Sequence, residues 1–277
     1  MTAAPHLNHL LPDRRRWLLG AASLAGLAAL PGCAVVPDAA PGPDEPAAAT
    51  PAPAQGPALF SAATALGGLP AGWHPHIMRR TVPATRYALV DKDQRRVIHA
   101  QAERSSSGLR CDVNLDPADQ PWLDWTWRVD AIDTRATVAD DDLDDSPARL
   151  ALAFDGDLST LPLRELMFRE QVELFTGHVL PFASLMYVWD GHAPVGSVFF
   201  YPRSRQIRYL VVESGPARTG QWLGYQRNVL QDYLQVFGHP PGRLRSVGVM
   251  SDSDDLKNSS QAWFGDLRFG SARPTGA

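Results

Sequence analysis

Carboxylates gather in two short segments of this chain, and carboxylate oxygens are the ligands that calcium prefers in proteins. The first segment is the aspartate run within residues 140–145, with Arg149 just beyond it. The second contains Asp252 and Asp254, and Asp266 follows on what reads as the last strand. We expect Asp252, Asp254 and Asp266 to bind a structural Ca²⁺. The alternatives are aspartates that cap turns and a solvated first segment salt-bridged to Arg149.

Two further carboxylates end apolar stretches and could do acid–base chemistry. Asp190 follows Tyr187-Val188-Trp189, and Glu213 precedes Ser214-Gly215. A glycosidase needs two carboxyl groups that flank the scissile bond. Glu213 and Asp190 are therefore the catalytic candidates, and the alternative for Glu213 is a salt bridge to an arginine such as Arg227.

Tryptophan faces stack on sugar rings, so exposed tryptophans in a β-sandwich would indicate glycan binding. Trp73, Trp122 and Trp222 lie near turn residues and are the candidates for ligand contact. Trp125 and Trp127 lie on the apolar side of an alternating stretch, which predicts that they pack in the core.

Alternating stretches must position these residues, and they dominate the chain. Residues 123–129, 149–154 and 207–212 alternate in the pattern of half-buried or buried strands. Two helices interrupt the strands. In the first, Leu163, Leu166, Met167, Glu170 and Leu174 share one face. The second spans about 228–237, and Gly238 and Pro240 end it. Many short strands separated by turns predict a mainly β fold, a jelly-roll-like β-sandwich with two short helices.

The N-terminus has the pattern of an exported lipoprotein. Arg14-Arg15-Arg16 precede an apolar run that is too short to span a bilayer, and Leu30-Pro31-Gly32-Cys33 matches a lipobox. We expect lipid on Cys33 and export by either the general or the twin-arginine route. Ala34 follows the cysteine where an inner-membrane retention signal carries Asp, which favours the outer membrane, facing the periplasm.

The predicted organisation follows from composition. We expect a signal peptide at 1–32, an Ala/Pro-rich disordered tether at 33–58, one β-sandwich domain at 59–270 and a disordered tail at 271–277. The net charge is −4, with no basic stripe, which argues against nucleic-acid binding. If Cys33 is acylated, Cys111 has no partner for a disulfide, and we expect it to be a small buried residue.

An ordered series of short stretches resembles a bacterial family of unknown function. The stretches are residues 121–129, 144–150, 187–190, 211–215, 220–222, 251–255 and 262–267. They resemble domain-of-unknown-function family 3047, which implies a secreted β-sandwich of jelly-roll, galactose-binding-domain-like type and no established activity. The acidic stretch departs from the family pattern at Asp255 and Leu256, where Asn and Thr are usual.

These observations predict a non-catalytic envelope lipoprotein that binds a glycan or another envelope component. Two alternatives remain open at this point. One is a glycan-active hydrolase on the same scaffold, which would need two carboxyl groups in one groove. The other is a structural protein that binds another envelope protein through a flat apolar surface.

Overall fold

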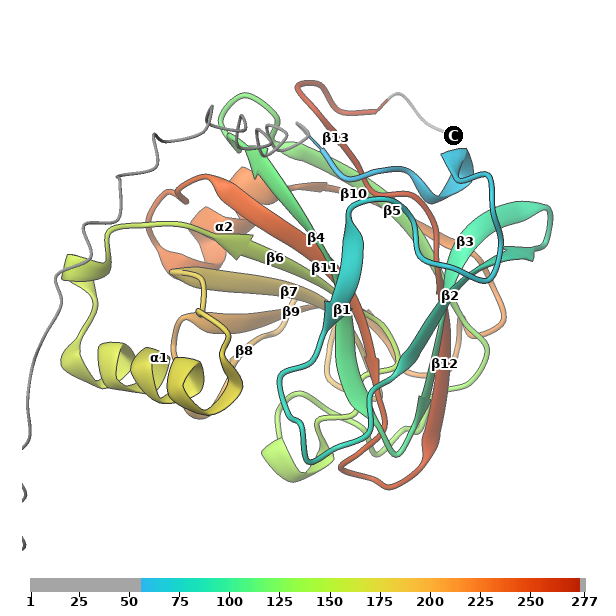
Figure 1. The fold of residues 1–277 in the computed structure, drawn as a ribbon, viewed down its shortest axis with the longest axis horizontal. Coiled ribbons are helices and arrows are strands. Elements are labelled where there is room, and N and C mark those ends of the chain that lie inside the picture. Colours follow the sequence, from blue (N-terminus) through green and yellow to red (C-terminus); the bar gives the residue numbers. More distant parts are fainter. Residues whose placement is uncertain (1–55, 275–277) are drawn as a thin grey trace, which may run out of the picture. The chain divides into compact units, whose positions relative to one another are not determined.

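The structure is a computed structural model that describes residues 56–274 of the chain. Two β-sheets make up the domain (Figure 1). The first sheet has seven strands, in the spatial order β1 (Trp73–His76), β4 (Ser106–Leu115), β11 (Leu244–Asp252), β6 (Arg149–Phe154), β7 (Ala183–Asp190), β9 (Ile207–Ser214) and β8 (Val198–Phe200).

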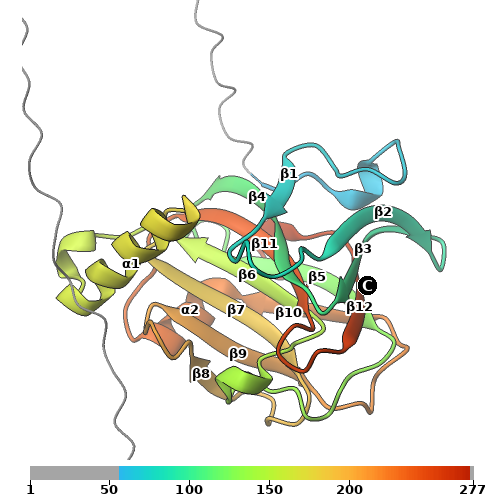
Figure 2. The ribbon, with the colours of Figure 1, turned by 60° about the horizontal axis from the view of Figure 1, so that its bottom comes forward.

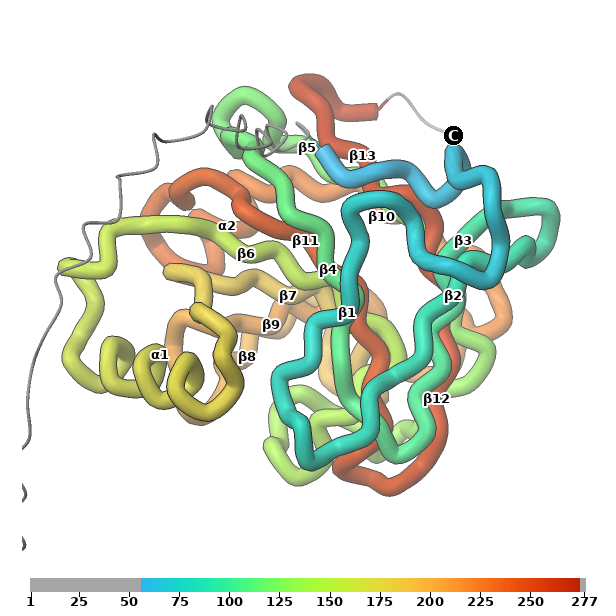
Figure 3. Tube along the Cα trace, viewed as in Figure 1, coloured from blue at the N-terminus to red at the C-terminus, as the bar shows by residue number. Residues whose placement is uncertain are grey.

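The second sheet has six strands. Its path is β10 (Leu223–Asn228), β5 (Trp122–Val129), β12 (Ser259–Phe264), β3 (Arg95–Glu103) and β2 (Arg86–Lys92), and β13 (Arg268–Gly270) also pairs with β5. Of the pairings described, only β7 with β9 is parallel. The first described residues run beside the segment that precedes the last strand (Figure 3), where the Ser61 amide donates to Asp266 at 2.9 Å.

The core fills the space between the two sheets, as the alternating stretches predict. In β5 the side chains of Leu123, Trp125, Trp127 and Val129 are buried, and the residues between them are half-buried. Trp125 stacks on Tyr187 of the opposite sheet with ring centroids 5.2 Å apart. The fold is therefore a β-sandwich, and the predicted core role of Trp125 and Trp127 is confirmed.

The helices are α1 (Leu163–Thr176) and α2 (Val229–Phe237), and short 3₁₀ turns occur at Phe60–Ala62, Asp141–Leu143 and Leu158–Thr160. The second helix forms as predicted. Asn228 accepts the Gln231 amide at its N-terminus, and Gly238 ends it with a left-handed φ of 80°.

Helix α1 lies outside the sandwich (Figure 2), beside β8 (Figure 1), and its apolar face does not pack on the sheets. Leu163, Met167 and Leu174 are 71%, 60% and 80% exposed. The buried residues are Glu165 and Phe168. Glu165 is buried because its carboxylate accepts the Ser204 hydroxyl and the Arg205 amide in the β8–β9 connection, at 2.6 and 3.0 Å.

The signal peptide, Cys33 and most of the predicted tether lie outside the described residues. Among residues 56–274, no helix has the length and apolar character that crossing a membrane requires. Cys111 is free and 5% exposed, in agreement with its predicted role as a small buried residue.

Candidate functional site

The two acidic segments, which are about a hundred residues apart in sequence, meet at one end of the seven-stranded sheet. The first segment precedes β6 and the second follows β11, and these strands are neighbours, with Met250 opposite Arg149. The Asp252 amide donates to the Ser146 carbonyl at 3.3 Å and extends this contact beyond the strands. Sheet pairing therefore brings the two runs of carboxylates into one site.

Arg149 lies between the two segments and is 3% exposed. Its guanidinium donates to Asp144 at 2.8 Å, forms an ion pair with Asp252 at 3.2 Å, and lies 5.6 Å from the centre of the Tyr209 ring. Burial alone would lower the pKa of Arg149, but the two carboxylates outweigh burial and raise it. Arg149 is therefore a fixed positive charge, and removing it would leave the buried Asp252 carboxyl group without a partner and the half-buried Asp144 with only the Tyr209 hydroxyl.

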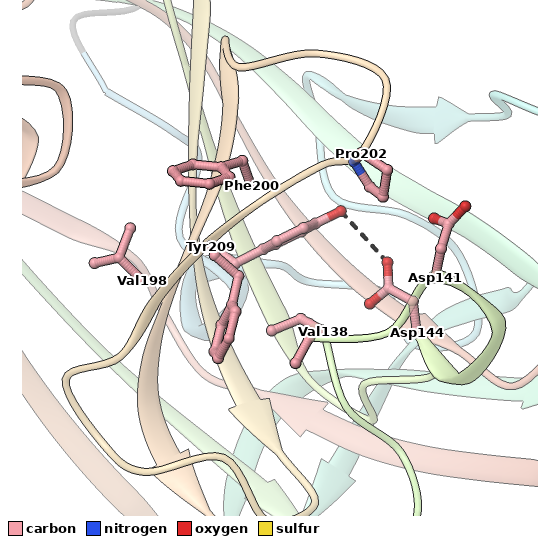
Figure 4. A pocket seen from close by; sticks show the side chains of 9 residues that line it. Val138, Asp141, Asp144, Val198, Phe200, Pro202 and Tyr209 are labelled. Atoms are coloured by element: carbon pink, nitrogen blue, oxygen red, sulfur yellow. Dashed lines mark hydrogen bonds between the residues drawn. The ribbon is translucent and has the colours of Figure 1, made fainter.

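The same network reaches the outer face of the seven-stranded sheet through Tyr209. Leu210 and Val212 point into the core between the sheets, so Tyr209 points outward. Its hydroxyl donates to the Asp144 carboxylate at 3.4 Å (Figure 4). Burial raises the pKa of Asp144 against the attraction of Arg149, and it raises the pKa of Asp252 further.

A pocket of about 180 Å³ opens beside Tyr209. We call it the outer-face pocket, and its lining residues are Val138, Ala139, Asp141, Asp144, Val198, Phe199, Phe200, Pro202 and Tyr209. Figure 4 shows carboxylates at one side of the pocket and the Phe200 ring at the other. Phe200 is 50% exposed, on the edge strand β8. The pocket thus combines apolar and aromatic surface with oriented carboxylates, which is a usual composition for a small-molecule site.

The structure does not assemble the predicted calcium set of Asp252, Asp254 and Asp266. Asp252 is paired with Arg149. Asp266 lies beyond the opposite end of β12, where it accepts the Ser61 hydroxyl at 2.5 Å and pairs with Arg268. A strand of six residues spans roughly 20 Å, so Asp266 and Asp254 cannot share an ion.

Asp254 instead has two other carboxylates as neighbours. One oxygen from each of Asp145, Asp254 and Asp255 lies within 4.8 Å of the others. Burial and repulsion from Asp254 and Asp145 raise the pKa of Asp255 to about 6. The sequence suggested both segments as calcium candidates separately, but it did not predict that a residue of one would join two of the other.

The catalytic candidates Asp190 and Glu213 are near one another along the sheet but point to opposite faces. Glu213 is paired in register with Trp189, and both side chains point into the core. Asp190 is the next residue after Trp189, so its side chain points to the outer face. Glu213 accepts the Tyr225 hydroxyl at 2.6 Å and pairs with Arg218 at 2.8 Å. It does not pair with Arg227, the arginine suggested from the sequence, which pairs with Asp232.

Asp190 is the last residue of β7, and its side chain is on the outer face. It is 1% exposed, and its carboxylate accepts backbone amides from Val138 at 2.9 Å and from Ala193 at 2.6 Å. These bonds fix the loop that carries the Val138 wall of the outer-face pocket. The two carboxylates therefore do not form the facing pair that glycoside hydrolysis needs.

The three predicted ligand tryptophans do not form one surface. Trp73 is 5% exposed, and its indole donates to the Ala58 carbonyl at 3.1 Å, so the expectation that it is exposed is wrong. Trp122 and Trp222 are half-buried, at opposite ends of the β5–β10 pair. Arg273 lies over the Trp122 ring and Arg95 over the Trp222 ring, at 5.6 and 5.2 Å.

Three aromatic residues line the outer-face pocket, Phe199, Phe200 and Tyr209, and none was among the predicted site residues. Phe200 is one of two phenylalanines in a short edge strand, and Tyr209 lies in a strand with apolar residues on both faces. Residues 207–212 carry apolar side chains on both faces of the strand, whereas a strand with a solvated outer face would carry polar residues there. This pattern could have indicated a pocket or another covered surface on the outer face.

The fold and site define a β-sandwich domain with an acidic and aromatic pocket on the outer face of its larger sheet. A family model described as "Protein of unknown function (DUF3047)" matches residues 71–268. The chain belongs to this family, as the resemblance predicted. Among curated proteins, no relative matches the chain.

Three solved structures illustrate the likeness to known folds. The K2 cleaved adhesin domain of Lys-gingipain has 9% identity and a TM-score of 0.36, covering 76% of this chain and 96% of that one. Endoglucanase 3 of Trichoderma harzianum, from family GH12, has 9% identity and a TM-score of 0.38, covering 74% and 93%. The family 11 carbohydrate-binding module of Clostridium thermocellum has 10% identity and a TM-score of 0.32, covering 76% and 100%.

Proposed function

We propose that this protein is a non-catalytic envelope lipoprotein whose β-sandwich binds a sugar unit of a glycan in the outer-face pocket. The observation that carries the proposal is the pairing of a half-exposed Phe200 ring with the Asp144 carboxylate across one pocket. Sugar rings have an apolar face and a rim of hydroxyl groups, and this pocket offers a surface suited to each.

The carboxylate side of the pocket is suited to accept hydroxyl groups. Asp144 is held from behind by Arg149 at 2.8 Å and by Tyr209 at 3.4 Å, so its orientation is set before a ligand arrives. Asp141, also in the lining, is exposed and therefore accessible to a ligand. Hydrogen bonds from hydroxyls to ionised carboxylates are stronger than neutral ones, and a fixed acceptor loses little entropy on binding.

The positions and hydrogen-bond partners of the acidic residues support binding without hydrolysis. Asp190 and Glu213 point to opposite faces of the sheet, and each is held by its own partners. Asp144 in the pocket is bound to a buried arginine that keeps its charge. A glycosidase needs two carboxyl groups that flank the scissile bond, whereas Asp141 and Asp144 lie on the same side of the outer-face pocket (Figure 4).

The lipid anchor is the second part of the proposal and rests on the sequence. The lipobox that ends at Cys33 would attach the protein to a membrane, with the outer membrane facing the periplasm favoured by Ala34. The Ala/Pro-rich residues after it would act as a spacer. A glycan or another envelope component is then the class of partner within reach of the domain.

The test is a glycan array followed by titration of the best ligand, with the purified chain and two phenylalanine variants. Phe200→Ala should weaken binding about tenfold, the loss expected for removing a central aromatic contact. Phe175→Ala is the matched control, because Phe175 is 73% exposed and does not line the pocket. Failure of every glycan to bind, or equal affinity of both variants, would reject the proposal.

A further inference from the structure

We propose that Asp145, Asp254 and Asp255 bind one calcium ion that joins the two acidic segments. Asp145 belongs to the loop before β6, and the other two belong to the turn between β11 and β12. This inference concerns a site distinct from the outer-face pocket, and it does not depend on glycan binding.

Backbone hydrogen bonds fix the Asp145 carboxylate against the turn that carries Asp254 and Asp255. The Asp145 carboxylate accepts the Asp255 amide at 3.0 Å with one oxygen and the Leu256 amide at 2.6 Å with the other. Asp145 is 4% exposed and Asp254 is also 4% exposed, so two of the three ligands are buried. The Asp145 and Asp254 side chains therefore lose little conformational entropy when an ion binds, because both are buried and hydrogen-bonded beforehand.

The Asp254 carboxylate is the observation that points to a ligand. Its Oδ2 accepts from Arg79 at 2.7 Å, but its Oδ1 is buried and has no hydrogen-bond partner among residues 56–274. A buried carboxylate oxygen without a partner is unfavourable, because it has lost its contact with water and gained no hydrogen bond in exchange. A cation beside Oδ1 would remove that cost.

The charges at the cluster also leave room for a cation. Three carboxylates face Arg79, whose side chain is 51% exposed and therefore a weak counter-charge. Lys257 lies nearby, but its ammonium donates to the backbone carbonyl of Asp254 at 2.5 Å and forms no ion pair with any of the three carboxylates. Arg149 is engaged by Asp144 and Asp252.

The donor atoms and their spacing select calcium. All three side-chain ligands are oxygens, which favours a hard cation. Oxygens no more than 4.8 Å apart fit around a centre at most about 2.8 Å from each, a limit compatible with the roughly 2.3–2.6 Å of Ca–O bonds. Magnesium demands near-ideal octahedral geometry and gives up its waters reluctantly, which suits carboxylates already bonded to backbone amides and to Arg79 poorly.

The experiment uses the full chain, stripped of metal with EDTA and then dialysed. Calcium chloride is titrated by calorimetry, and thermal melting is followed with calcium, with magnesium and with EDTA. At a hundredfold excess over Kd, calcium should raise the melting temperature by about 5–10 °C, and magnesium should raise it less. The variants are Asp254→Asn and Asp255→Asn, which keep the side-chain shape and remove one charged ligand.

Both variants should lose at least tenfold in calcium affinity, and Asp142→Asn should keep the wild-type response. Asp142 is an exposed aspartate of the same loop but lies outside the cluster, so it is the matched control. Asp255 is only half-buried, so Asp255→Asn keeps the test decisive if Asp254→Asn fails to fold. No binding heat and no melting shift, or an equal shift in Asp255→Asn, would overturn the site.

Discussion

Replacement of Arg149 by methionine would test whether the buried ion network stabilises the site. Methionine fills a similar apolar volume and removes the guanidinium that serves both Asp144 and Asp252. Arg149 and Asp252 are 3% and 4% exposed, so water cannot replace the lost contacts without opening the fold. The substitution therefore leaves the buried Asp252 carboxyl group unpaired and removes the ion pair of the half-buried Asp144.

The expected loss is about 3–5 kcal/mol in the free energy of unfolding, the range for breaking a buried ion pair by removing one partner. For a domain of this size that lowers the melting temperature by roughly 6–20 °C. Arg110→Met is the control. Arg110 pairs at 2.9 Å with Asp112, whose side chain is 60% exposed, and a surface pair contributes about 0–1 kcal/mol.

The loss in the free energy of unfolding of Arg149→Met should also depend on pH. Burial raises the pKa of Asp144 and Asp252 in the folded chain, and without Arg149 the raising would be larger. The folded variant would then bind more protons than the unfolded chain, so its stability should recover as pH falls from 7 toward 5. The assay is urea unfolding at both pH values. A loss below 1 kcal/mol, or a loss that grows in acid, would refute the reasoning.

Three other outcomes follow from the structure and the sequence. Leu174→Gln should change the free energy of unfolding by less than about 0.5 kcal/mol in chemical denaturation, because Leu174 is 80% exposed. Burial, with repulsion from His178 and Arg110, lowers the pKa of His76 from 6.5 to about 4. The folded chain therefore binds fewer protons than the unfolded chain, so its stability falls as the pH falls. Acidification from pH 7 to 5 should lower the free energy of unfolding by about 1 kcal/mol, after allowance for the partial exposure of His76. His76→Phe should remove this loss. Cys33→Ser should release the protein from the membrane fraction, and sedimentation of the variant with membranes in high salt would contradict a lipid anchor.

The sandwich was predictable because local patterns and the fold agree along most strands. The alternation at residues 123–129 reads directly as β5, and the caps at Asn228 and Gly238 read as the ends of α2. The ordered stretches also identified the family. In each case the information lies within a few neighbouring residues, which is the range over which periodicity and capping act.

Helix α1 and the site were less predictable because long-range contacts decide them. The burial of Glu165 depends on Ser204 and Arg205, which are about forty residues away. The site of Asp145 with Asp254 requires β6 and β11 to be neighbours, which periodicity does not specify. A register shift between Val188 and Trp189 places Glu213 in the core, and the sequence carries no local sign of it.

The most direct test of glycan binding is a crystal structure of the chain with the tightest glycan found on the array. The proposal predicts one sugar ring against Phe200, with its hydroxyl groups within hydrogen-bonding distance of Asp144. A sugar bound elsewhere would contradict it, for example on the outer face of the six-stranded sheet at Trp122 or Trp222, with the outer-face pocket empty.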